Sequence, residues 1–125
     1  DEMVRDADPI EDVLPKFMEF INGSAVVAHN AAFDMSVLHE SIKAIGSDTP
    51  NMKYFCSLQL SRRTIENHRY GLNYMMQYYN LDFHGHHDAL NDAKACAMIT
   101  FRLLKHYDDL SSMLNIYGKD LKDKD

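Results

Sequence analysis

Two stretches of the chain carry residue types that could do metal-assisted chemistry, and the first follows an apolar run. His29 and Asn30 come directly after residues 25–28, a short apolar run that predicts a buried strand, and Asp34 lies in the first turn of the helix predicted next. Ligands of open α/β sheets collect outside the carboxyl ends of the strands. A helix N-terminus also favours negative charge by roughly 0.3–1 kcal/mol. Asp34 is therefore predicted to lie where such sheets usually do chemistry.

The second stretch places His87 five residues before Asp92. On one α-helix that separation is about 140° around the axis, so the two side chains would not share a face. They converge only if His87 lies just before the helix and folds back over its first turn. Asp92 would then occupy the start of its helix as Asp34 does. Two such carboxylates suit a Mg²⁺ or Mn²⁺ site, and the imidazole is better placed as a base than as a ligand.

Each of these residue types also has a plainer explanation. An aspartate at a helix start is more often a cap than a ligand. Histidines without a nearby cysteine are more often surface residues than a zinc site, and this applies to His84, His86 and His87. The run at 74–79 fits core packing better than base stacking. Exposure to solvent explains Arg62, Arg63 and Arg69 better than phosphate binding does.

Composition limits the class of protein. The length of 125 residues suits one small domain. A formal charge of −6 opposes a general nucleic-acid coating protein but is compatible with an acidic pocket whose cations meet phosphate. No apolar run approaches the roughly 20 residues of a membrane span, so no membrane partner is expected. Cys56 and Cys96 lack metal-ligand spacing and are interpreted as reduced thiols of a cytoplasmic protein.

The apolar periodicity predicts a helix-rich α/β fold with two short strands. The predicted strands are 25–28 and 52–56, and the predicted helices are 10–21, 31–45, 58–65, 72–79 and 88–107. Pro15 predicts a kink in the first helix, or a helix that begins near it. Residues 1–117 are assigned to one domain portion and 118–125 to a disordered tail. Two parallel strands do not make a stable sheet alone.

The two stretches together resemble one enzyme family. His29-Asn30-Ala31-Ala32-Phe33-Asp34, followed by His87-x4-Asp92, resembles the DnaQ-like branch of the DEDD 3′–5′ exonucleases, in its histidine variant. That group includes the proofreading epsilon subunit of bacterial DNA polymerase III and free-standing bacterial exonucleases. The resemblance implies a ribonuclease H-like exonuclease fold. The Asp-x-Glu that forms the family's first motif is absent, so the chain is expected to be the C-terminal part of the domain, lacking its first strands.

The resemblance also implies a mechanism and assigns roles to residues. Asp34 and Asp92 correspond to metal ligands for two Mg²⁺ or Mn²⁺ ions, His87 to the general base, and His29 and Asn30 to residues that contact substrate at the mouth of the site. The implied reaction releases nucleoside monophosphates from single-stranded 3′ ends of DNA.

Two alternatives stay open at the level of sequence. The same chemistry could act on RNA, or the chain could be a non-catalytic fragment that binds nucleic acid or a DNA polymerase. Because helix 10–21 and strand 25–28 would be left with bare apolar faces, the chain alone is expected to self-associate and to be inactive.

Overall fold

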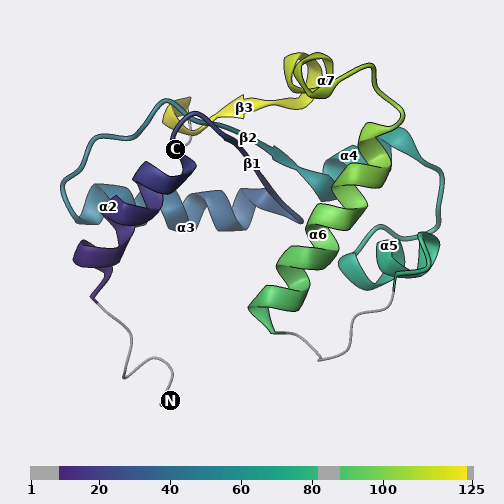
Figure 1. Cartoon of the computed structure of the whole chain (residues 1–125), viewed down its shortest axis with the longest axis horizontal. Coiled ribbons are helices and arrows are strands. Elements are labelled where there is room, and N and C mark those ends of the chain that lie inside the picture. Colours follow the sequence, from purple (N-terminus) through teal and green to yellow (C-terminus); the bar gives the residue numbers. More distant parts are fainter. Residues whose placement is uncertain (1–8, 82–87, 124–125) are drawn as a thin grey trace.

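A short sheet lies between two layers of helices in the computed structural model, which describes residues 9–81 and 88–123 (Figure 1). β1 (Ala25–Ala28) pairs in parallel with β2 (Lys53–Cys56), with Val27 opposite Phe55. β2 pairs on its other side with the antiparallel β3 (Lys119–Asp120). The strand order β1-β2-β3 leaves one edge of β1 without a strand partner in the part of the chain that the structure describes.

The helices follow the chain around this sheet. Their bounds are α2 (Ile10–Ile21), α3 (Ala31–Ala44), α4 (Ser57–Thr64), α5 (Leu72–Tyr78), α6 (Ala89–Leu104) and α7 (Leu110–Tyr117), with the short 3₁₀ helix η1 (Leu121–Asp123) after β3. Within these described segments, no helix combines the length and the apolar character needed to cross a membrane.

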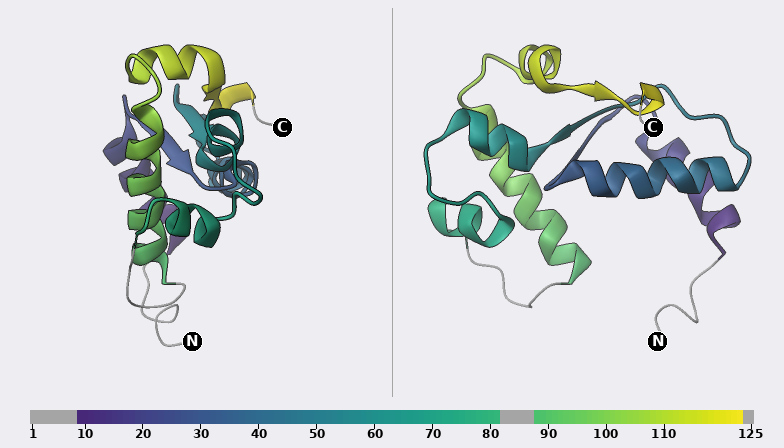
Figure 2. Two further views of the ribbon diagram at one scale, coloured as in Figure 1. Left: turned by 90° about the vertical axis from the view of Figure 1, so that its right-hand side faces the viewer. Right: turned by 180° about the vertical axis from the view of Figure 1, so that it is seen from behind.

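Strand alternation divides the core into two clusters, one on each face of the sheet. Val26 and Tyr54 belong to the cluster that α2, α3 and η1 build, around the buried side chains Met35, Ile42 and Leu121. Val27 and Phe55 belong to the cluster that α4, α5, α6 and α7 build, around Leu60, Met75, Ile99, Leu103 and Met113. Figure 2 shows α3 and α6 on opposite sides of the strands. Each face of the sheet is therefore covered by its own set of helices.

The fold class and most elements agree with the sequence prediction, because they follow directly from apolar periodicity. Both strands and five helices form within a few residues of their predicted bounds. α2 runs without a break through Pro15, beginning after Pro9, whose carbonyl accepts from Asp12 and Val13. α7 was not predicted, although Asp109 caps it by accepting from the Ser112 amide at 2.7 Å.

The C-terminal segment differs from the predicted disordered tail. Residues 119–123 form β3 and η1, and the Leu121 side chain is fully buried in the α2–α3 cluster. The Leu121 amide donates to the Met52 carbonyl at 2.9 Å, and Lys53 pairs with Asp120 at 3.1 Å. One buried leucine and one strand pairing order a segment whose local composition is mostly charged. The division into a domain portion and a tail at residue 117 stays a prediction.

The burial of Leu121 predicts a stability effect that a frayed tail would not show. Leu121→Ala should lower the free energy of unfolding by about 2–5 kcal/mol, because it removes buried methyl groups and leaves a cavity. Leu90→Ala is the matched control, since Leu90 is 64% exposed. Urea unfolding followed by circular dichroism measures both variants. Equal, small losses in the two would show that residues 119–123 do not pack on the core.

Candidate active site

Asp34 is the fourth residue of α3, and two residues separate the end of β1 from the start of that helix. Its carboxylate is exposed and has no hydrogen bond or ion pair within the described residues. Asn30 occupies the N-cap position with φ 74° and ψ 54°, in the left-handed region that asparagine adopts more readily than most residues. This sharp turn brings the start of α3 back onto the end of β1. Asp34 is therefore not the cap of its helix.

Asp92 occupies the corresponding fourth position of α6 and is also exposed. The cap of α6 is Asp88, whose Oδ1 accepts from the Asn91 amide at 2.8 Å. The Asn91 side-chain amide donates to the other Asp88 oxygen at 2.9 Å. The Asp92 amide donates to the Asp88 carbonyl at 3.0 Å, but the Asp92 carboxylate has no hydrogen bond or ion pair among the residues that the structure describes. Asp88 is thus the residue that caps α6, and the Asp92 carboxylate is not used for capping.

The two carboxylates belong to helices that contact the same strand from opposite faces. α3 and α6 both contact β1, and Figure 2 shows them on opposite sides of the strands. Within residues 9–81 and 88–123, no group of three or more His, Cys, Asp or Glu side chains is arranged to hold a metal ion. The predicted base His87, with His84 and His86, lies outside the described residues.

His29 has partners inside the protein for both ring nitrogens. Nε2 lies 2.7 Å from the Tyr70 carbonyl oxygen, which can only accept, so Nε2 carries the proton. In the neutral ring Nδ1 then accepts from the Ser57 hydroxyl at 2.8 Å. The Ser57 oxygen in turn lies 3.4 Å from Cys96 Sγ, whose thiol is left to donate to it. His29 therefore links the end of β1 to the starts of α4 and α5 and to α6.

Burial sets the protonation state of this hydrogen-bonded chain. Desolvation lowers the pKa of His29 below its ordinary value of 6.5, with the Tyr70 carbonyl opposing the shift. Desolvation also raises the pKa of the Cys96 thiol, opposed by its hydrogen bonds to Ser57 and Thr100. Both groups are therefore neutral at pH 7, which matches the donor and acceptor roles above.

Sequence reasoning did not find this chain of contacts. Ser57 and Cys96 have no distinctive neighbours in sequence, and Tyr70 contributes only a backbone carbonyl. The one available signal is that Ser57 directly follows strand β2, at the same sheet edge as His29. The prediction that His29 and Asn30 contact substrate stays a prediction. In the structure the Asn30 side chain is exposed, whereas the imidazole of His29 is half-buried.

Comparison with known proteins identifies the class to which this fold and these motifs belong. The family model RNase_T, described as an exonuclease family, matches residues 1–100. The chain belongs to this exonuclease family, and the resemblance to DnaQ-like exonucleases drawn from the two histidine–aspartate stretches is confirmed.

PolC-type DNA polymerases III are among the curated proteins that the chain matches. The chain is 38% identical to that of Caldanaerobacter subterraneus subsp. tengcongensis over 109 residues, which cover 86% of the chain and 8% of the relative. It is 34% identical to that of Listeria monocytogenes over 94% of the chain and 8% of the relative. For Staphylococcus aureus the identity is 32% over 100% of the chain and 9% of the relative. The chain thus spans less than a tenth of the length of these relatives.

The lowered pKa of His29 predicts a pH dependence of stability. Because the unfolded chain binds a proton at this ring more readily than the folded chain, stability falls as pH drops below about 6.5 and the loss stops below the folded pKa. His29→Gln removes the titrating group. Urea unfolding of both proteins between pH 7.5 and 5 measures the difference between their free energies of unfolding. This difference should narrow as the pH falls. Parallel stability curves would show that His29 titrates alike in both states.

Proposed function

We propose that this chain supplies part of the catalytic site of a metal-dependent 3′–5′ exonuclease that acts on single-stranded DNA ends. One observation carries the proposal. Asp34 and Asp92 hold the same position in two helices that flank β1, and both carboxylates are exposed and unpaired within the described residues. Exposed carboxylates in the first turns of two helices that contact the same parallel strand suit phosphoryl chemistry better than they suit packing.

The donor set fits divalent cations. Carboxylate oxygens are the ligands that Mg²⁺ and Mn²⁺ prefer, and the proposed site takes two such ions. Two carboxylates supply only part of the coordination shell of two ions, so further ligands are needed to complete it. Bound divalent ions supply positive charge at the scissile phosphate and lower the pKa of water. Asp34 and Asp92 would bind these ions and so fix the position of their positive charge.

His87 is proposed as the general base that takes the proton from the attacking water. It directly precedes Asp88, the cap of α6, and so lies close in sequence to the first turn that carries Asp92. An imidazole with a pKa near its ordinary value of about 6.5 accepts a proton efficiently at neutral pH. Cations nearby favour its neutral form, which is the form a base requires.

The residues at the end of β1 take different proposed roles. Asn30 is exposed at the start of α3, and we propose that its side chain contacts the DNA strand at the mouth of the site. For His29, whose two ring nitrogens bond inside the protein, we propose that it acts on substrate through the position of the β1–α3 turn. RNA remains the alternative substrate of the same chemistry.

Exposed apolar side chains favour a further surface contact. A stripe on α2, formed by Ile10, Val13, Phe17 and Phe20, is exposed in the single chain, and Phe33 of α3 is 69% exposed. Burying such surface stabilises by about 25 cal/mol per Å². We propose that a second copy of the chain, or further polypeptide such as that of a polymerase, covers this stripe together with the open edge of β1.

Removing either carboxylate should abolish cleavage without unfolding the protein. In an active exonuclease domain that contains this chain, Asp34→Asn and Asp92→Asn should each lower the rate of Mn²⁺-dependent cleavage of a single-stranded oligonucleotide by more than about 100-fold. Stability should stay within about 0.5 kcal/mol, since both residues are exposed. Asp48→Asn makes the same charge change on an exposed loop and is the control.

The comparison of these three variants decides the proposal. Equal activity in all of them would remove Asp34 and Asp92 from the chemistry. Loss of folding in Asp34→Asn or Asp92→Asn, with cleavage per folded molecule unchanged, would make the residue structural instead.

A further inference from the structure

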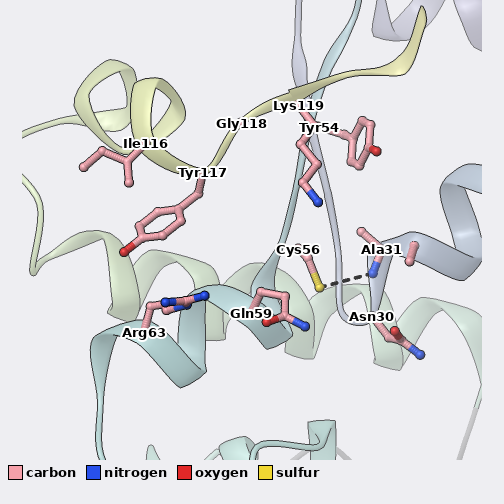
Figure 3. Close-up of a pocket in the computed structure, with 11 residues that line it drawn as sticks. Asn30, Ala31, Tyr54, Cys56, Gln59, Arg63, Ile116, Tyr117, Gly118 and Lys119 are labelled. Carbon is pink, nitrogen blue, oxygen red and sulfur yellow. Dashed lines mark hydrogen bonds between the residues drawn. The ribbon is translucent and has the colours of Figure 1, made fainter. Parts of the chain in front are cut away.

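A cavity of about 330 Å³ lies beside the carboxyl end of β2, between the start of α3, α4 and the α7–β3 junction (Figure 3). Its volume is near the lower end of the roughly 300–1,000 Å³ typical of small-molecule sites. Tyr54 and Cys56 of β2 form its floor, and Ile116 and Tyr117 form an apolar wall. The cavity is thus large enough for a small ligand and has one apolar side.

Two cations border this cavity from different elements. Lys119 comes from β3 and Arg63 from the last turn of α4, and in Figure 3 both side chains extend toward the space between them, with Gln59 below. The pairing of Tyr54 with Lys119 puts both side chains on the same face of the sheet. Neither the Arg63 side chain nor the Lys119 side chain has an ion pair or hydrogen-bond partner within the described residues.

No carboxylate is among the described residues that line the cavity, although the chain carries a formal charge of −6. The nearest acid in sequence, Asp120, points to the other face of the sheet, where it pairs with Lys53 at 3.1 Å. The start of α3 also lines the cavity and adds the partial positive charge of a helix N-terminus. The described lining therefore carries two cations and no carboxylate, although the Asp123 carboxylate acts electrostatically on Tyr54, one of the lining residues.

The cavity is separate from the candidate active site. Ala32 lines it, whereas Asp34 lies two residues further along α3, about 200° around the helix axis. Asp92 belongs to α6, and no described residue of α6 lines the cavity. A ligand in the cavity therefore does not share the carboxylates proposed to hold metal ions.

We propose that this cavity binds the phosphate group of a nucleotide. Lys119 and Arg63 contact the phosphate oxygens, the Gln59 amide donates a further hydrogen bond, and the nucleoside lies against Tyr117 and Ile116. Phosphate is the anion that such convergent cations recognise, and an arginine can bind two of its oxygens at once. The phosphate can belong to a free nucleoside monophosphate or to a DNA strand. This site does not depend on the proposed nuclease activity.

Titration of the 125-residue chain in EDTA tests the site without any metal-mediated contact. The probes are thymidine 5′-monophosphate, a short oligothymidylate without terminal phosphates, and thymidine as the ligand without phosphate. Amide chemical shifts of Gly118 and Lys119 report binding in ¹H–¹⁵N NMR spectra. At least one phosphate-bearing probe should shift these signals, and thymidine should not. Preference for the monophosphate or for the oligothymidylate identifies the source of the phosphate.

Neighbouring residues provide matched variants. Arg63→Gln should weaken binding about tenfold, as loss of one charge-assisted hydrogen bond does, whereas Arg62→Gln on the same helix turn should not. Lys119→Met should weaken binding in the same way, with Lys122→Met as its control. Both control residues are exposed and do not line the cavity. Absence of binding by both phosphate probes, or equal affinity in test and control variants, would overturn the proposal.

Discussion

The parallel pairing of β1 with β2 is the constraint on which the rest of the structure depends. It joins Ala25–Ala28 to Lys53–Cys56, and both strands end at the same edge of the sheet. α3 and α4 begin there, so their N-terminal turns share that edge. The same pairing gives the sheet two apolar faces, which separate helices cover. The edge of β1 opposite β2 has no strand partner in the described chain, and the two candidate carboxylates belong to the helices on either side of it.

The hydrogen-bonded chain through His29 ties these parts together. It runs from the end of β1 to Ser57 at the start of α4, to Cys96 in α6 and to the backbone ahead of α5. Buried polar groups are costly unless they are paired, and here burial keeps the imidazole neutral so that each contact has one donor and one acceptor. A second contact, from the Ala31 amide to Cys56 Sγ at 3.3 Å, fixes the start of α3 against β2. The turn that carries Asn30 is held from both sides.

Local pattern was enough to predict most of the fold, and its failures have physical causes. The valines of β1 and the apolar spacing of α3 and α6 identify those elements, because the apolar residues that recur in the sequence are also those that face the core. β3 and η1 were missed because they depend on Leu121 and on pairing with a strand far away in sequence. For the site, the predicted helix starts correctly put Asp34 and Asp92 in the first turns of their helices. The partners of His29 come from two other segments, and the one sign of them in the sequence is that Ser57 directly follows the second strand.

The central claim is that Asp34 and Asp92 contribute to one metal site, and paramagnetic NMR tests it most directly. Substoichiometric Mn²⁺ added to the ¹⁵N-labelled chain should broaden the amide signals in the first turns of α3 and α6 together. Asp34→Asn should then reduce the broadening in α6 as well as in α3, because the site would have lost a shared ligand. Broadening confined to one of the two helices, or unchanged in α6 after Asp34→Asn, would contradict the account.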